Sequence, residues 1–105
     1  MSPALCAVIE AADDLAWRPT SNTSHVVAYR ARQESARNLR EAVARLGRVR
    51  ETEPIVLLLV AAIRRASAQT YANRQGPPYY ARKEAIYQLR GCLDVWHRFV
   101  LEGAA

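Results

Sequence analysis

The sequence predicts an all-α protein, a single-domain antiparallel four-helix bundle with a short first helix. Half of the 105 residues are apolar, and alanine and arginine are common while glycine and proline are few, which is typical of helices. Apolar residues recur at helical spacing in four separate segments. Short connections between such segments favour antiparallel neighbours. A chain of this length forms one domain, so we assign residues 1–105 to a single helical bundle.

The first predicted helix covers about residues 3–16. Ser2 can cap its start, and Pro3 suits a first turn in which no amide donor is needed. The segment "WRPTSNTS" then ends the helix at Pro19 and supplies turn-forming residues. The apolar positions at helical spacing are Leu5, Val8, Ile9, Ala12 and Leu15.

The second predicted helix runs from about residue 24 to 49, with Thr23 or Ser24 as its cap. Arg32 occupies a position in the apolar pattern where a hydrophobic residue would be expected. The apolar rows contain Tyr29, Ala36 and Val43, and Leu39 and Leu46. On the outer face, charges of alternating sign at three- and four-residue spacing predict a ladder of ion pairs worth ~0.2–0.5 kcal/mol each. The ladder residues are Arg30, Glu34, Arg37, Glu41 and Arg45.

The third predicted helix starts at "TEP", with Thr52 as cap, Glu53 at the positive helix end and Pro54 in the first turn. It continues to about residue 73, and "RQGPP" ends it around Gly76. The run "IVLLLVAAI" is apolar on all sides, which predicts a helix surrounded by the others. This run is far shorter than the ~20 residues of a membrane span. We therefore expect a soluble, cytoplasmic protein.

The fourth predicted helix, about residues 78–102, has the clearest core-facing stripe. We expect Trp96 to lie in the core rather than to serve as a platform for a ligand. The first row repeats every seven residues at Tyr79, Ile86, Leu93 and Val100. Leu89 and Trp96 form the second row, and Cys92 and Phe99 widen the stripe.

The sequence gives no sign of an enzyme. It has no glycine-rich phosphate loop and no cysteine–histidine spacing typical of a metal site. Asp13 and Asp14 are adjacent and so point apart on a helix, and His97 is expected to be a boundary residue rather than a catalyst. We therefore expect no catalytic residue, metal, cofactor, small-molecule substrate or membrane contact.

The two cysteines, Cys6 and Cys92, are expected to be small buried hydrophobes in a reducing cytosol, and whether they lie close together stays open.

Basic residues gather where the third helix ends and the fourth begins. The net charge is +5, and in an antiparallel bundle the start of the second helix lies at that same end. Arg64, Arg65 and Arg74 suit the negative end of the third helix. Arg82 and Lys83 instead lie in the first turns of the fourth predicted helix, where a cation costs ~0.3–1 kcal/mol. This departure predicts a polyanion partner, with tyrosines that can stack on bases. The candidate nucleic-acid-binding residues are Arg64, Arg65, Arg74, Arg82, Lys83, Arg90, Arg30, Arg32, Tyr71 and Tyr80.

Other interpretations of these residues stay open. Arg90 can instead pair with Asp94, four residues on. The charges can form a solvated helix hairpin that only maintains solubility. The chain can also be a protein-interaction module, such as a phage-type inhibitor or helical adaptor, that docks an acidic surface. Tyr80, Tyr87 and Val95 lie off the main core row and can form a second contact surface, and a homo-oligomeric scaffold is a further alternative.

The segments "SHVVAYRARQESARNLREAV" and "LRGCLDVWHRFVLEGA" resemble, in pattern, the small helical-bundle subunits of multisubunit CRISPR-Cas effector complexes. The resemblance implies RNA and DNA binding in an antiviral ribonucleoprotein complex, in which copies stack along the crRNA-bearing backbone. Such copies would line a groove for crRNA–target duplex or displaced strand without sequence readout, while other subunits cleave. The acid-rich first helix departs from this pattern, and no site residue is transferred from the family.

Overall fold

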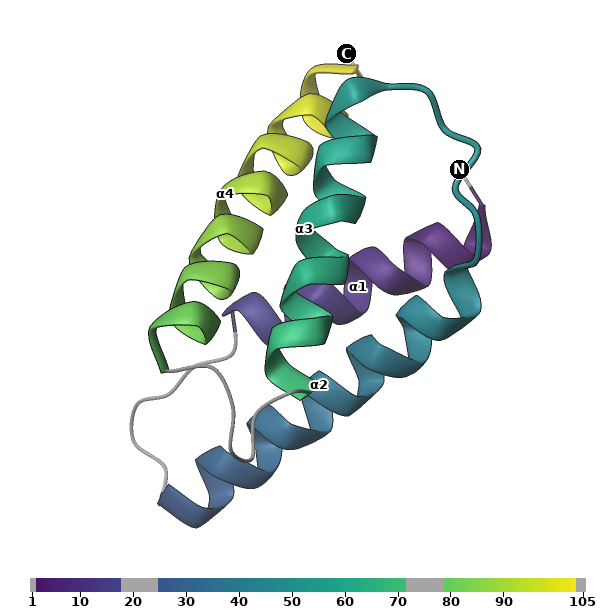
Figure 1. The fold of residues 1–105 in the computed structure, drawn as a ribbon. Helices are drawn as coiled ribbons and strands as arrows, with labels where there is room; N and C mark the ends of the chain where they lie inside the picture. The colour runs from purple at the N-terminus through teal and green to yellow at the C-terminus, as the bar shows by residue number, and fades with distance from the viewer. Residues whose placement is uncertain (1, 18–24, 72–78, 104–105) are drawn as a thin grey trace.

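The computed structural model describes residues 2–17, 25–71 and 79–103, apart from the side chains of residues 25–29, 70–71 and 79. Four helices form it: α1 (Pro3–Trp17), α2 (His25–Leu46), α3 (Pro54–Tyr71) and α4 (Tyr79–Gly103) (Figure 1). The predicted all-α fold class is confirmed. The predicted chain breaks at Pro19 and Gly76, and the caps Thr23 and Ser24, lie outside the described residues.

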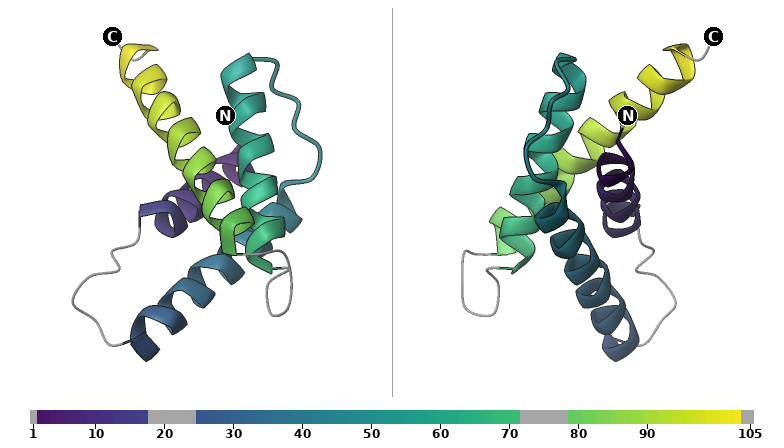
Figure 2. Two further views of the ribbon diagram at one scale, coloured as in Figure 1. Left: turned by 60° about the vertical axis from the view of Figure 1, so that its left-hand side comes forward. Right: turned by 90° about the vertical axis from the view of Figure 1, so that its right-hand side faces the viewer.

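The helices form a compact bundle in which each contacts two principal neighbours. The most extensive contacts join α3 to α4 and α1 to α2, while α2 also packs on α3 and α1 on α4. Within the described residues, no Cα atom of α2 lies within 8 Å of one in α4. Figures 1 and 2 show α1 lying across α3 and α4 rather than alongside them. The four helices therefore do not share one common axis.

The start of α1 follows the prediction from the sequence. The Leu5 amide donates to Ser2 Oγ at 3.2 Å, and Pro3 is the first helical residue. A serine hydroxyl at this position satisfies an amide that has no partner within the helix. One face of α1 enters the core through Leu5, Val8, Ile9, Ala12 and Ala16.

Helix α2 ends at Leu46, three residues earlier than predicted, because Gly47 has φ 63°. Glycine adopts this left-handed conformation readily and commonly terminates helices. Leu39 is buried, and Val43 and Leu46 pack partly against the core.

The predicted ion-pair ladder on the outer face of α2 is not formed. All five side chains are exposed, and no ion pair occurs among these described residues: Arg30, Glu34, Arg37, Glu41 and Arg45.

Helix α3 begins at Pro54, so Glu53 rather than Thr52 directly precedes it, and the Glu53 carbonyl accepts from the Leu57 amide at 3.1 Å. The prediction that its first half is surrounded on all sides is wrong. Leu57 and Leu58 are 47% and 66% exposed, because α1 hardly contacts α3 and one face is left open. The buried face consists of Val56, Leu59, Val60, Ala62, Ile63 and Ala66.

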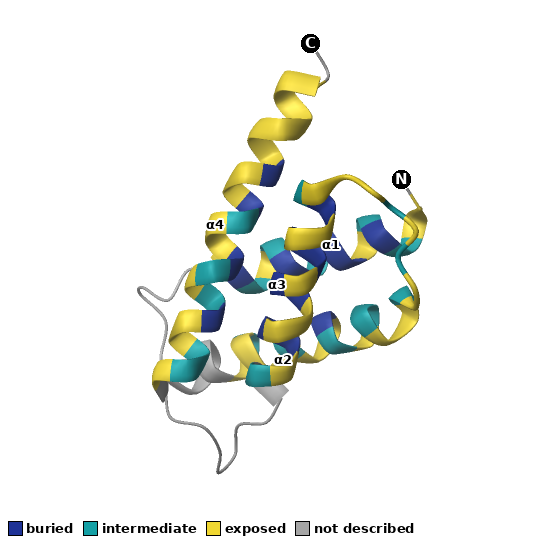
Figure 3. Ribbon diagram, turned by 45° about the horizontal axis from the view of Figure 1, so that its top comes forward, coloured by how far each residue is buried: buried dark blue, intermediate teal, exposed yellow. Residues whose placement is uncertain are grey.

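The core stripe of α4 is confirmed in its middle and fails at its end. Leu89, Leu93 and Trp96 are buried, as the periodicity predicts. Phe99 and Val100 are instead 41% and 43% exposed. Figure 3 shows that the last turns of α4 are exposed on all sides, and Figure 2 shows that α4 diverges from α3 toward this end. Helical periodicity identifies the inner face, but it does not show where two packed helices diverge.

Within the described residues, the helices carry no stretch that is both long and apolar enough to span a bilayer. The same residues contain no group of three or more histidine, cysteine or acidic side chains placed to hold a metal ion. Cys6 and Cys92 are free and half-buried, so they are more accessible than predicted.

Candidate nucleic-acid interface

The predicted basic residues fall into two groups. Arg64, Arg65 and Arg90 lie within helices and bond to other parts of the fold. The other four predicted site cations that the structure describes lie among the first eight residues of α2 and the first five of α4: Arg30, Arg32, Arg82 and Lys83. The two groups therefore have to be assessed separately.

Arg64 bonds to the end of α2. Its Nη2 donates to the Gly47 carbonyl at 2.7 Å. The expectation that Arg64 and Arg65 stabilise the end of α3 is wrong, because α3 runs on to Tyr71 and its last turn contains no basic residue. Carbonyls at a helix end lack partners within the helix, and a cation is favourable beside them. Arg64 supplies this contact to α2 instead.

Arg65 points to α4 rather than to α2. Its Nη1 donates to Oε1 of Gln88, and Gln88 Nε2 lies 3.5 Å from Glu84 Oε1. Consecutive residues on a helix are turned by about 100°, which explains why adjacent arginines reach different neighbours. Arg65 therefore contributes to the α3–α4 contact.

Arg90 connects α4 to the end of α1. Its Nε donates to the Ala16 carbonyl at 2.6 Å, and its guanidinium lies over the Trp17 ring, 5.7 Å from the ring centroid. The alternative pairing with Asp94 is wrong, because Asp94 pairs with Arg98 at 3.2 Å. An arginine fork and an aromatic face are well matched for such a contact. Arg90 therefore joins two helices, as Arg64 and Arg65 do.

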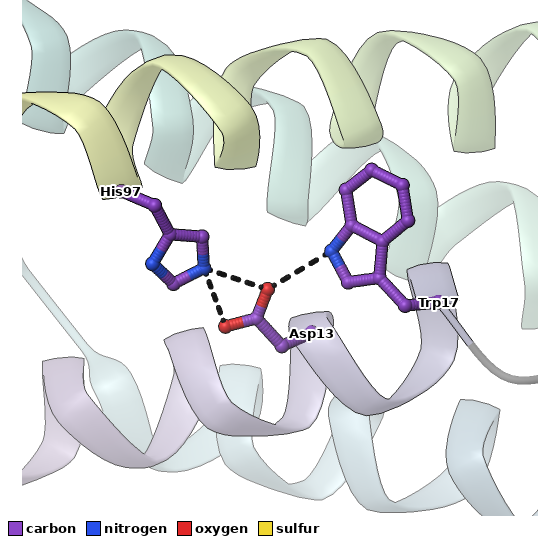
Figure 4. Close-up of polar contacts among 3 residues, drawn as sticks. All are labelled: Asp13, Trp17 and His97. Carbon is purple, nitrogen blue, oxygen red and sulfur yellow. Dashed lines mark hydrogen bonds and ion pairs between the residues drawn. The ribbon is translucent and has the colours of Figure 1, made fainter.

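The acids of α1 complete the contacts between α1 and its neighbours. His97 Nε2 lies 3.0 Å from both carboxylate oxygens of Asp13, and Trp17 Nε1 donates to Asp13 Oδ1 at 3.2 Å (Figure 4). On the other side of α1, the buried Ser35 donates to Asp14 Oδ2 at 2.6 Å. Asp13 and Asp14 thus point apart, as expected. They join α1 to α4 and to α2, which gives the acids of the first helix a structural role.

We call the residues Arg30, Arg32, Arg82 and Lys83 the basic end. Arg30, Arg32 and Lys83 are exposed, and Arg82 is half-buried. The first eight residues of α2 and the first five of α4 contain no acid. Figures 1 and 2 show that α4 begins close to where α3 finishes, and that α2 begins on the same side of the molecule but projects well beyond them.

Tyr80 is the aromatic residue that the structure places at the basic end. It lies in the first turn of α4 and is 75% exposed. Glu34 and Glu84 are the exposed acids that follow the basic residues on α2 and α4. Tyr71 is the last residue of α3 with its side chain outside the description, and Arg74 lies beyond the described residues. The structure therefore places eight of the ten predicted site side chains, and four of the eight form the basic end.

A hollow of about 270 Å³ lies elsewhere, between the start of α1 and the segment after α2. Arg48 and Arg50 are exposed at this hollow, which the sequence analysis did not single out. Glu51 lies beside them and partly offsets their charge. The hollow is lined by Ser2, Ala4, Leu5, Leu46, Arg48, Val49, Arg50 and Glu51.

Comparison with known proteins gives no match: no family model fits the sequence, and none of the curated proteins or solved structures compared with the chain resembles it. The functional argument therefore depends on the chain's own residues.

Proposed function

We propose that the protein is a non-catalytic nucleic-acid-binding subunit whose basic end holds a sugar–phosphate backbone. One observation carries the proposal: Arg82 and Lys83 are the fourth and fifth residues of α4, where acids would be favoured, and Arg30 and Arg32 are the sixth and eighth residues of α2, before its first acid. The positive end of a helix dipole favours acids, so cations there cost ~0.3–1 kcal/mol each. Bound phosphate groups would offset the cost of placing cations there.

Binding of this kind is electrostatic and independent of base sequence. Arginine can donate two parallel hydrogen bonds to a phosphate, and lysine contributes a point charge. Each neutralised phosphate releases condensed counterions, which makes affinity fall steeply as salt rises. Tyr80, which is largely exposed beside these cations, can stack on an unpaired base. Arg64, Arg65 and Arg90 support this surface indirectly, because they hold the helices together.

The most specific form of the proposal is a small subunit of a CRISPR effector complex. It would line a groove for crRNA–target duplex or displaced strand, and other subunits would carry out cleavage. The pattern resemblance of residues 24–103 supports this form, together with the net charge of +5.

A fluorescent single strand of about 30 nucleotides, as RNA and as DNA, tests the proposal at about 50 and 200 mM salt. We expect saturable binding at low salt that weakens strongly at high salt. The variant Arg30→Glu/Lys83→Glu should lose this binding.

The matched control is Arg48→Glu/Arg50→Glu, which changes net charge equally at two other exposed positions. It should retain most of the binding. Equal losses in the two variants would show a diffuse charge effect and would overturn the assignment to the basic end. Absence of binding to either strand at the lower salt would overturn the proposed function.

A further inference from the structure

The outer face of α4 carries exposed aromatic and apolar side chains opposite its core stripe. Tyr87 is 75% exposed and Val95 is 53% exposed, whereas Leu89 and Leu93 are fully buried. Positions three, four and seven residues apart share one helical face, so Tyr87 and Val95 lie together on the solvent side. The exposure of both residues confirms that they lie outside the core and leaves them accessible to another molecule.

Gly91 lies between these two side chains and has no packing role in a single copy. A Cβ added there would meet no atom within 4 Å. Glycine inside a helix costs ~0.8–1 kcal/mol relative to alanine, so the helix alone would favour a different residue. A bare backbone at this position lets a second helix approach closely, with Tyr87 and Val95 on either side of the crossing.

The charges on this face are self-complementary about Gly91. Glu84 lies seven residues before Gly91, and Arg98 lies seven residues after it. Tyr87 and Val95 lie four residues before and four after. In an antiparallel pair of identical helices that cross at Gly91, a residue before the crossing faces the residue equally far after it on the other copy. Glu84 would then face Arg98 and Tyr87 would face Val95, each of these contacts occurring twice.

The flanking positions fit the same register. Gln88 and Asp94 lie three residues on either side of Gly91 and would face each other, although within one copy Gln88 bonds to Arg65 and Glu84, and Asp94 pairs with Arg98. No like charges face each other in these pairs. A parallel alignment would instead bring each charged residue opposite its own copy.

The end of α4 gives an independent reason for a partner. Residues 97–103 stay helical although all of them are exposed, and Leu101 is 74% exposed (Figure 3). Within this segment His97 contacts Asp13 and the Phe99 ring stacks on Trp96, and no side chain is buried. Helical turns with so few packing contacts are marginal in water. In the antiparallel pair, this extension would lie along the beginning of α4 in the other copy. We propose that two copies of this chain form a symmetric dimer through the outer faces of α4, with Gly91 at the crossing.

This dimer does not depend on nucleic-acid binding, and a two-fold contact of this type closes on itself. Its test is the mass of nucleic-acid-free protein, measured by sedimentation equilibrium over a range of concentrations. We expect a monomer–dimer equilibrium. Gly91→Arg should weaken dimerisation on the order of 100-fold, because it separates the helices and sets two cations face to face. Its dilute form should melt no lower than the parent, since arginine is the better helix former.

A charge exchange tests the register. Glu84→Arg and Arg98→Glu should each weaken the dimer on the order of 10-fold, and the double exchange should recover most of that loss. Glu41→Arg on the exposed face of α2 is the control and should leave dimerisation unchanged. A parent protein that stays monomeric at all concentrations would overturn the proposal. So would a dimer that tolerates Gly91→Arg, or a double exchange weaker than both single variants.

Discussion

The arginines inside α3 and α4 and the cations at the basic end have different surroundings in one small molecule. Arg64, Arg65 and Arg90 each donate to a group on another part of the fold. Arg30 and Lys83 lie exposed near the starts of their helices, and Lys83 lies where the helix dipole disfavours a cation. The comparison teaches that the net charge of +5 is not one binding surface. Part of it bonds between separate parts of the fold, and part of it lies near the starts of α2 and α4.

The contacts between helices depend first on the apolar core. Leu93 is fully buried on the inner face of α4, within the same core cluster as the buried residues of α1 and α3. Leu93→Ala should lower the free energy of unfolding by ~2–5 kcal/mol, because it removes buried methyl groups and leaves a cavity. Chemical denaturation followed by circular dichroism measures this effect. A stability equal to that of the parent would contradict the assigned register of α4.

Arg90 allows a smaller and more direct comparison. Arg90→Met removes the bond to the Ala16 carbonyl and the contact with Trp17, and should cost about 1 to 2 kcal/mol of unfolding free energy. Arg90 and Arg30 are both exposed, but among the described residues only Arg90 makes such contacts, so Arg30→Met is the matched change and should stay within about 0.5 kcal/mol of the parent. Denaturation of both variants under one condition measures the difference. Equal stabilities would remove the structural distinction between the two groups of cations.

The sequence predicts those parts of the fold that depend on local patterns. Ser2 and Pro3 mark the start of α1 because capping involves neighbouring residues, and the periodicity of α4 identifies Leu89, Leu93 and Trp96 as core. It does not predict that Phe99 and Val100 are exposed. That outcome depends on where α4 diverges from α3, which no spacing within α4 records.

Contacts between distant residues were the least predictable. The sequence offered Asp94 as a partner for Arg90 because the two are four residues apart, whereas the observed partner, Ala16, lies in another helix. Asp13 and Asp14 had no evident role until α1 was placed between His97 and Ser35. Ser35 lies within the core-facing pattern of α2 and was the available signal for the contact with Asp14, since a buried hydroxyl requires a hydrogen-bond partner.

The separation of the two groups of cations is tested most directly by removing the same amount of charge from each. The affinity for a single strand at low salt, and the melting temperature, are to be measured for Arg30→Gln/Lys83→Gln and for Arg64→Gln/Arg65→Gln. We predict that the first variant loses affinity on the order of 10-fold or more and melts like the parent. The second should melt at a lower temperature and retain more of its affinity. A larger loss of affinity in the Arg64/Arg65 variant while it is fully folded would contradict the account.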